Sequence, residues 1–422
     1  MPRGRSRPNN PAPPVPHMRV WIDAAAASGA ATVFGLTPVE RLLRGFVRLR
    51  IPPTEVLLSG GSPPGRILGG LPVRQLLEQG PAGTRLATYV AAAPDAVLAL
   101  DGASEIDGRL LEFLAQQTTS VAAIGEPADD PAAAMLVADG ATIAPDTAGA
   151  TLADVAWAAI DAGRARELTQ EEFPSFIANL RRDLPFYLFR VRDAAAARRA
   201  ERFLFRSNYK GSTDFLTKWI YPPLVWRLTL AATQAGIHAN VITLVSILLA
   251  ILVVPFFAAG DWIAGFLAAY AMSVLDSVDG KVARVTMSDS WIGNLLDHGL
   301  DILHPPFWYF AIAWGISGGD MAAGPFIAAV LLVVFYVADR LVLMISKARW
   351  GYGLHAHAPI DARIRTWIAR RNTNLVLLTI GYLAGRLPEA FFLVMVWQGL
   401  TLAWHVGRTV WLLKHKPATA MR

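Results

Sequence analysis

The sequence predicts an α-helical integral membrane bundle of six transmembrane helices, preceded by a soluble, doubly wound α/β domain. Three observations predict this. The chain is 54% hydrophobic and only 17% charged, whereas soluble proteins carry about 25% charged residues. Uncharged apolar runs long enough to cross a membrane lie after residue 238, the first being 241–260. Before that point, short apolar runs of strand type alternate with segments of helical periodicity. The predicted division is a disordered tail (1–17), a soluble domain (18–165), a linker with interfacial helices (166–237) and a membrane domain (238–415).

The tail and the overall charge limit the classes of protein to which this chain can belong. Residues 1–17, MPRGRSRPNNPAPPVPH, are rich in Pro and Arg and contain no apolar core, which excludes a secretory signal and predicts disorder. The net charge of +6 suits either nucleic acid or an anionic membrane face. Because the hydropathy favours the membrane, we expect a lipid bilayer and no nucleic acid as partner. The chain has no cysteine, which excludes disulfides and thiolate metal sites.

The soluble domain shows alternating strand and helix patterns. RVWIDA (19–24) and TEVLLSG (54–60) are apolar runs of strand type. Between them TPVERLLRGFVRLR has helical periodicity, with Thr37 as N-cap and Pro38 at the first helical position. DAVLALDG (95–102) predicts a buried strand that ends in a carboxylate, and EIDGRLLEFLAQ predicts the next helix. Strands and helices that alternate at short spacing predict a parallel doubly wound sheet.

The linker region mixes basic and aromatic residues. Residues 179–211, NLRRDLPFYLFRVRDAAAARRAERFLFRSNYKG, interleave Arg with Phe, Leu and Tyr. That composition is typical of a helix lying in the lipid headgroup layer. A solvated linker helix is the alternative, but the position immediately before the first span favours the interfacial interpretation.

Six apolar segments follow, and the positive charges between them orient the bundle. The predicted spans are 241–260, 262–282, 292–315, 321–345, 372–388 and 389–412. Basic residues gather before the first span, between the fourth and fifth, and in the C-terminal tail. The positive-inside rule then places both termini, the soluble domain and the loop between spans two and three in the cytoplasm, in a multi-pass protein of the inner membrane.

A cluster of carboxylates lies at the end of the second span, in DSVDGKVARVTMSDSWIGNLLDHGLD (276–301). Asp276 and Asp279 share one helical face, and Asp297 and Asp301 share another. Single pairs of this kind are usually helix caps or solvated positions, but two facing pairs need a countercharge. Oxygen ligands suit Mg²⁺, Mn²⁺ or Ca²⁺. Two such ions would bind a pyrophosphate and promote displacement at phosphorus.

These residues fit the pattern D-x2-D-G-x2-A-R-x8-G-x3-D-x3-D at every fixed position. The pattern resembles the CDP-alcohol phosphotransferase family of membrane enzymes over about 205–415, including the six spans. The resemblance implies that an acceptor hydroxyl attacks the β-phosphorus of a CDP-linked donor and that CMP leaves, in phospholipid synthesis. It also implies two Mg²⁺ (or Mn²⁺) ions and a homodimer.

The resemblance also assigns roles residue by residue. It implies that the metal ions are held by four aspartates, with Asp301 also acting as general base: Asp276, Asp279, Asp297 and Asp301. It implies that the nucleotide site is lined by Gly280, Ala283, Arg284 and Gly293. Asn240 and Thr243, in HANVIT, match positions that contact CDP, although Ala239 stands where the family often has proline.

Two substrate schemes stay open. A CDP-linked polar alcohol and a lipid hydroxyl, such as diacylglycerol or a ceramide, are favoured by Asp297-His298-Gly299, because the eukaryotic choline and ethanolamine phosphotransferases resemble it. Alternatively, CDP-diacylglycerol reacts with an inositol or glycerol phosphate. His298 could contact a substrate, although helix packing explains it at least as well. In the second scheme the acceptor phosphate could be bound by Arg340, Lys347, Arg349 or Arg408, although positive-inside anchoring explains each of these better. An intramembrane prenyltransferase would place its two aspartate clusters far apart, and a transporter or inactive scaffold need not keep the whole pattern.

The N-terminal half is similar to nucleotidyltransferases that make CDP- or UDP-activated alcohols, which occur fused to CDP-alcohol phosphotransferases. The similarity lies in VFGLTPVERLLRGFVRLRIPPTEVLLS and DAVLALDG. Active relatives carry an Arg in a Gly-rich loop followed by a Lys, whereas DAAAASGAATVFG has neither. Only Asp101 matches a candidate metal position. The resemblance therefore implies a degenerate domain with a structural, dimerising or regulatory role.

Overall fold

A computed structural model describes residues 18–48, 53–61, 70–92, 95–143, 150–177, 180, 182–209, 211, 213–288 and 291–415. In the helix that begins at Trp291, the side chains of residues 291, 292, 294–298, 300 and 301 lie outside this description. The tail predicted for residues 1–17 also lies outside it. The described residues form two compact units: one runs to Ser175 and includes Pro185–Phe203, and the other comprises Phe176–Leu184 and Leu204 onward.

The first unit is built on a seven-stranded sheet with strand order β3-β2-β1-β4-β7-β6-β8. The strands are β1 (Arg19–Asp23), β2 (Glu55–Ser59), β3 (Val73–Leu76), β4 (Val97–Asp101), β6 (Val121–Ile124), β7 (Ala133–Val137) and β8 (Arg166–Glu167). The α/β class is confirmed, but the sheet is mixed rather than parallel, because β7 runs antiparallel to β4 and β6. No helix separates β6 from β7, and a parallel pair needs a crossover of a dozen residues or more.

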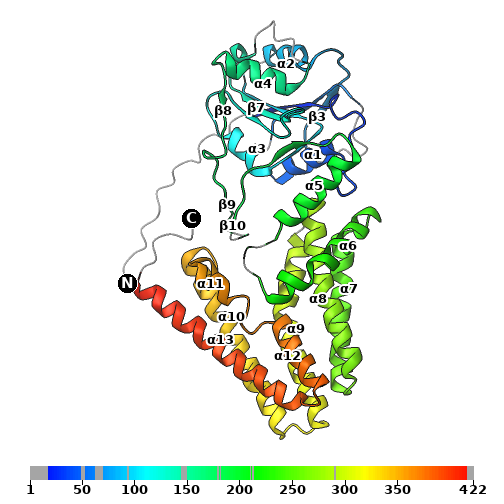
Figure 1. Cartoon of the computed structure of the whole chain (residues 1–422), viewed down its shortest axis with the longest axis vertical. Helices are drawn as coiled ribbons and strands as arrows, with labels where there is room; N and C mark the ends of the chain where they lie inside the picture. The colour runs from blue at the N-terminus through cyan, green and yellow to red at the C-terminus, as the bar shows by residue number, and fades with distance from the viewer. Residues whose placement is uncertain are drawn as a thin grey trace. The chain divides into compact units, whose positions relative to one another are not determined.

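Helices cover both faces of this sheet. They are α1 (Pro38–Arg48), α2 (Ala82–Ala91), α3 (Gly108–Ala115) and α4 (Leu152–Asp161). Apolar side chains of α1 and α3 pack in one core cluster, and those of α2 and α4 pack in another. Figure 1 shows the sheet between these two helix pairs. The predicted start of α1 is confirmed, because the Glu40 amide donates to Thr37 Oγ1 at 3.2 Å and the Thr37 amide donates back to Glu40 Oε2 at 2.9 Å.

Short elements precede the long helices. The first unit adds the antiparallel pair β5 (Ser104–Ile106) and β11 (Leu188–Arg190) and the 3₁₀ turn η1 (Gly140–Thr142). The second unit has the pair β9 (Phe176–Ile177) and β10 (Arg182–Asp183). Helix α5 (Ala194–Ser207) is followed by a π-helical turn, η2 (Leu216–Ile220), and by α6 (Pro222–Gln234). Trp219, Ile220 and Leu224 are exposed, in the region predicted to be interfacial.

Six longer helices follow in the second unit: α7 (Ala239–Ala258), α8 (Trp262–Val285), α9 (Trp291–Ser317), α10 (Gly324–Trp350), α12 (Arg371–Leu383) and α13 (Leu387–His415). A 3₁₀ turn, η3 (Leu354–Ala356), and the short helix α11 (Pro359–Ile364) connect α10 to α12. Among the described residues, four of these helices are long and apolar enough to cross a membrane: α7, α8, α10 and α13. They indicate a membrane-embedded protein.

The count of six spans stays a prediction, because α12 and α9, part of which lies outside the description, are not among these four helices. Residues 372–388 were expected to cross, but α12 has 13 residues and ends at Leu383. Gly385 follows with φ of 70°, a left-handed conformation that favours glycine and ends helices. At 1.5 Å per residue, α12 is about 20 Å long, shorter than a hydrocarbon core of about 30 Å.

Close packing at α7 and α8 shows how these helices are held together. A Cβ at Gly265 of α8 would lie 2.4 Å from the ring of Phe257, so only glycine lets the two helices approach there. The Trp308 indole of α9 donates to the Ala250 carbonyl of α7 at 2.9 Å. On the outside of α7, Leu244 and Ile251 are more than 60% exposed, as expected for side chains that face lipid.

Candidate active site

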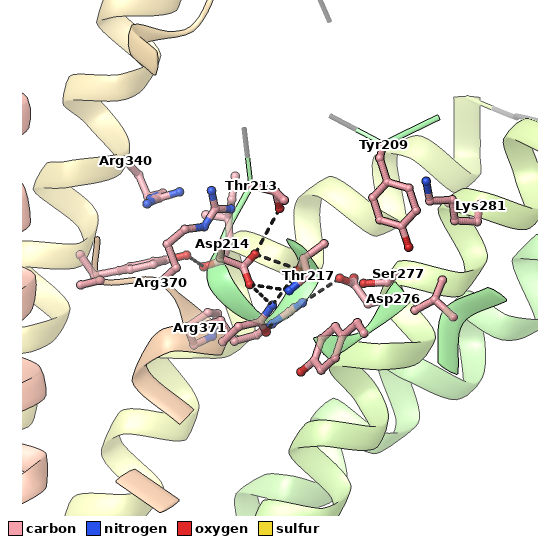
Figure 2. Close-up of a pocket in the computed structure, with 18 of the residues that line it drawn as sticks. Tyr209, Thr213, Asp214, Thr217, Asp276, Ser277, Lys281, Arg340, Arg370 and Arg371 are labelled. Carbon is pink, nitrogen blue, oxygen red and sulfur yellow. Dashed lines mark hydrogen bonds and ion pairs between the residues drawn. The ribbon is translucent and has the colours of Figure 1, made fainter. Parts of the chain in front are cut away.

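The second unit contains a polar cavity of about 440 Å³ at the C-terminal part of α8. Its walls come from α6 and the segment before it, from α8, α9, α10 and α13, and from the residues around the start of α12. Figure 2 shows Arg340 and Arg370 on one side of it, Tyr209 and Lys281 on the other, and Asp214, Arg371 and Asp276 between them. The lining therefore joins residues from both ends of the helical sequence.

Helix α8 places the two first aspartates of the motif differently. Asp276 lines the cavity, and its carboxylate lies 2.7 Å from the guanidinium of Arg371. Asp279 is only 3% exposed and accepts a hydrogen bond of 2.7 Å from the hydroxyl of Thr243 on α7. Both carboxylates therefore have positive or hydroxyl partners, as buried acids require.

Gly280 leaves room for the guanidinium of Arg284, four residues later on the same helix. A Cβ at Gly280 would lie 3.3 Å from both Nη atoms of Arg284, a tighter approach than most side chains make. Both residues line the cavity. The glycine thus lets a cationic side chain fold back along α8 and face the cavity.

Asp214 connects the segment before α6 to α12. Its carboxylate accepts hydrogen bonds from the amide of Thr217 at 3.1 Å and from Asn372 Nδ2 at 3.0 Å. Asn372 in turn accepts from the hydroxyl of Ser273 on α8. Burial alone would raise the pKa of Asp214, but the charge of Arg370 and these hydrogen bonds outweigh it and lower the pKa. Asp214 is therefore ionised and joins its own segment to α12 (Figure 2), and Asn372 in turn joins α12 to α8.

A second polar network lies beside the cavity, between α10, α13 and η3. The Arg340 guanidinium, on the cavity wall, donates to Asp339 at 2.8 Å. Asp339 is wholly buried and bonds to Nδ1 of His405, whose Nε2 lies 3.2 Å from Nε2 of His355. Burial lowers the pKa of His355 well below 6.5, and the charge of Arg365 adds to this. His355 is therefore neutral and can share a hydrogen bond with His405.

Comparison with known protein families identifies the kind of domain that contains this site. Residues 236–411 match the family model described as CDP-alcohol phosphatidyltransferase. The helical unit carries a CDP-alcohol phosphatidyltransferase domain. The protein is accordingly an enzyme that transfers phosphate-containing groups. No curated protein matches the chain.

Three similar solved structures are of phosphatidylinositol phosphate synthase (PgsA1) from Mycobacterium tuberculosis. The structure with CDP-DAG bound is 17% identical, covers 45% of this chain and 93% of its own, and has a TM-score of 0.36. The complex with manganese and citrate is 16% identical, with coverages of 45% and 89% and a TM-score of 0.37. The apo form is 16% identical, with coverages of 44% and 95% and a TM-score of 0.35.

Within the CDP-alcohol phosphatidyltransferase domain, the predicted nucleotide residues are partly placed. Gly280 and Arg284 line the cavity, with Ala283 on the same turn of α8. Asn240 is exposed at the start of α7, where its backbone N–H donates a hydrogen bond to Nδ1 of His238. Gly293 lies in α9. Their roles in binding CDP stay predictions.

Helix α9 also carries Asp297, His298 and Asp301, but their side chains lie outside the described part of the structure. Among the described side chains, no group of three or more His, Cys, Asp or Glu could hold a metal ion. This search contains only Asp276 and Asp279 of the four predicted ligands, so the four-aspartate site stays a prediction.

The four cationic residues predicted as acceptor contacts separate in space. Arg340 is the one of them found among the described lining residues. Lys347 and Arg349 are exposed near the end of α10. The Arg408 guanidinium lies 2.8 Å from Asp361 and 4.5 Å from the ring centre of Trp411. Their contact with an acceptor stays a prediction.

Several lining residues were not predicted as site residues: Tyr209, Asp214, Lys281, Arg370, Arg371 and Asn372. The pair Arg370-Arg371 was visible only as part of a basic connection between spans. Asp214, in the stretch STDFLTKW, had the form of a helix cap before an apolar run, but nothing in the sequence indicated that it contacts a residue 158 positions away.

The α/β unit holds its own cluster of charges, at the carboxyl ends of β1 and β4. Asp101, the predicted metal position, is wholly buried and bound by Nε of Arg190 at 2.7 Å. Asp23 is held by Arg85 at 2.6 Å. Arg85 and Arg190 also line a cavity of about 390 Å³. Here each carboxylate is paired with an arginine from elsewhere in the unit, and Asp23 also lines this cavity, whereas Asp101 is not among its described lining residues.

Proposed function

We propose that the CDP-alcohol phosphatidyltransferase domain transfers a substituted phosphate group from a CDP-linked donor to an alcohol, with release of CMP, in a reaction that needs a divalent metal ion. The observation that carries the proposal is a complete aspartate-glycine-arginine pattern in the sequence, part of which lines a polar cavity. Asp276, Gly280 and Arg284 line that cavity.

The residues present suit a hard metal ion. Asp276 and Asp279 offer carboxylate oxygens on successive positions of one helical face, and Thr243 adds a hydroxyl beside Asp279. An all-oxygen donor set favours Mg²⁺ or Mn²⁺ over zinc. We propose that these two aspartates, with Asp297 and Asp301, hold two such ions. When bound, the ions would neutralise the diphosphate and the charge that develops on the leaving group.

The chain's own groups would carry the remaining steps. Asp301 accepts the proton of the acceptor hydroxyl while the oxygen of that hydroxyl bonds to the β-phosphorus. The bond from that phosphorus to the oxygen of CMP breaks, and CMP leaves with the electron pair. Arg284, folded over Gly280, is placed to contact a donor phosphate.

The cavity lining favours a phosphorylated acceptor. Its described residues include five cationic side chains (Lys281, Arg284, Arg340, Arg370 and Arg371) and two carboxylates (Asp214 and Asp276). A positive site prefers a ligand with more negative charge than a diphosphate alone. We therefore favour CDP-diacylglycerol with an inositol or glycerol phosphate over a CDP-linked polar alcohol with a lipid hydroxyl, and we assign Arg340 to the acceptor phosphate.

We further propose six spans, with the bilayer locally thinner around the short α12, a homodimer, and an inner-membrane location with both termini and the α/β unit in the cytoplasm. Basic residues at the predicted cytoplasmic connections support the orientation. For the α/β unit we propose a structural or regulatory role as a degenerate nucleotidyltransferase. The support is Arg190, whose guanidinium lies against Asp101 where an active enzyme would need an open carboxylate.

The test is CMP release by the purified protein in vesicles with Mg²⁺, over a panel of CDP-alcohols and acceptors, with mass spectrometry of the lipid product. We expect D301N to lower kcat about 10²–10⁴-fold, as loss of a general base does. D320N is the matched control, because Asp320 lies in the turn between α9 and α10. Full activity of D301N would refute the base assignment, and release of no CMP from any donor would refute the reaction.

A further inference from the structure

Lys281 follows Gly280 in the motif on α8, yet the fixed pattern assigns it no role. It lies on the cavity wall but is only 4% exposed. A buried ammonium group is costly unless its charge is compensated. The groups that surround the Lys281 ammonium and compensate its charge therefore indicate its role.

The compensation comes from the segment just before the helical bundle. The Lys281 ammonium donates a hydrogen bond of 3.3 Å to the Phe205 carbonyl. It also lies 3.3 Å from the ring centre of Tyr209 and 4.9 Å from that of Phe205. Aromatic faces attract cations through their quadrupole, and most strongly where water is excluded.

The two rings are themselves held in place. Phe205 is 5% exposed and meets Tyr209 and Trp226 edge to face, at centroid distances of 5.3 and 5.0 Å. Lys281 occupies a face of the Tyr209 ring, so the orientation of that ring is fixed from α8. Figure 2 shows the Tyr209 hydroxyl pointing toward Ser277 and Asp276.

This orientation gives the hydroxyl a defined chemistry. Burial raises the pKa of Tyr209 to about 12, so the phenol is neutral at physiological pH and can donate a hydrogen bond. The cavity on that side is lined by Asp276, Gly280 and Arg284. The proposed function assigns Asp276 to the metal ions that neutralise the diphosphate and Arg284 to a donor phosphate. A phenol that donates to an anionic phosphate oxygen makes a strong, charge-assisted bond.

We propose that Tyr209 contacts the diphosphate of the CDP-linked donor through its hydroxyl, and that Lys281 is the positioning residue that holds the ring in place. The inference rests on the proposed function for its ligand. It adds a donor contact from outside the family pattern, supplied by the segment between α5 and η2. Lys281 acts through the ring, because its ammonium is held by the Phe205 carbonyl and two aromatic faces.

The experiment measures binding of CDP with Mg²⁺ to the full-length protein by calorimetry, and separately the KM for donor in CMP release. We expect Y209F to weaken CDP binding about 10-fold, the loss of about 1.4 kcal/mol typical of one hydrogen bond to a charged group. Its melting temperature should stay that of the wild type. Y382F is the matched control, since Tyr382 lies in α12 and is not among the described lining residues.

Lys281 is tested through the same measurement. K281M should weaken CDP binding to a similar degree, and K281R should restore most of it, because a guanidinium also stacks on aromatic faces. The double variant K281M/Y209F should bind CDP no more weakly than Y209F within about twofold, since both act through one hydroxyl.

The possible failures are distinct. Wild-type affinity in Y209F, or additive losses in the double variant, would overturn the inference, as would a wild-type protein that does not bind CDP. A wild-type protein that binds CDP but releases no CMP from any CDP-alcohol would refute the proposed reaction, while the Y209F comparison would still decide the role of Tyr209.

Discussion

The two units both place aspartates beside arginines, but in opposite settings. In the α/β unit, the side chains of Asp101 and Arg190 are 1% and 4% exposed. In the helical unit, those of Asp276 and Arg371 are 19% and 15% exposed, and both line the 440 Å³ cavity. The residue types are the same and Arg190 also lines a cavity, so the exposure of the paired side chains is what separates the two sites.

The difference teaches how to distinguish a structural ion pair from a working one. A fully buried pair must stay together, because either charge alone would be stranded in a low dielectric. A pair at a cavity edge can exchange partners with a ligand that brings its own charge. Mutation of the first kind of pair should lower the stability of the protein, and mutation of the second kind should lower its activity.

Breaking the buried pair should give the largest effect. We expect R190A to destabilise the α/β unit by about 3–5 kcal/mol, because it leaves Asp101 buried without its cation. The measurement is denaturant unfolding of the full-length protein in detergent micelles. R192A is the control, since Arg192 pairs with Asp130 from a 61% exposed position and such pairs contribute about 1 kcal/mol or less. A loss in R190A no larger than in R192A would erase the distinction between the two settings.

Breaking the cavity pair should instead be felt in catalysis. If Asp276 ligates a metal ion as proposed, we expect R371Q to lower kcat/KM for CMP release about 10–100-fold, because it removes the partner that orients this carboxylate. The free energy of unfolding should change little, because Asp276 lines the cavity and is not left in a closed core. R386Q is the matched control, since the Arg386 side chain is 72% exposed at the start of α13. If R371Q lost stability and kept its activity, the pair would be structural after all.

The third and smallest expected difference between the two units is in how their stability responds to mild acid. Residues 18–203 contain no histidine, whereas the helical unit buries His355 with its pKa well below 6.5. A histidine that is neutral when folded and titrates normally when unfolded gives stability that is complete above pH 6.5 and declines as the pH falls toward the folded pKa. The decline should be about 1.4 kcal/mol per pH unit at most.

The measurement for this prediction is the melting temperature of the full-length protein at pH 7.5 and 5.5. H355Q should remove most of the pH dependence, while R192A, in the α/β unit, should retain it. An equal pH dependence in H355Q and the wild type would assign the effect to another group.

Much of the local structure follows from local pattern. Apolar runs and the Thr37 cap predicted β1, β2, β4, α1 and α3, and uncharged runs predicted the positions of the long helices. The direction of β7 did not follow, because strand periodicity is the same in parallel and antiparallel neighbours. The length of α12 was misjudged, although Gly385 and Arg386 interrupt the apolar run.

The candidate site divides in the same way. Its motif residues lie within 276–301, so helical spacing alone groups them. The contacts of Asp214 with Asn372 and of Arg371 with Asp276 join residues 158 and 95 positions apart. No periodicity in the chain records such pairs, since they depend on how whole helices pack. The same holds for Lys281, whose burial depends on a segment 76 positions away.

The shortness of α12 has a consequence for where lipid and water meet. Its neighbour α13 has 29 residues, against 13 in α12. If the far end of α12 reaches one face of a hydrocarbon layer about 30 Å thick, then Arg371 at its start lies about 10 Å below the other face. Charged groups at that depth draw the aqueous boundary inward. The CDP-diacylglycerol donor that we propose could then bring its phosphates to Arg371 while its acyl chains stay in their own leaflet.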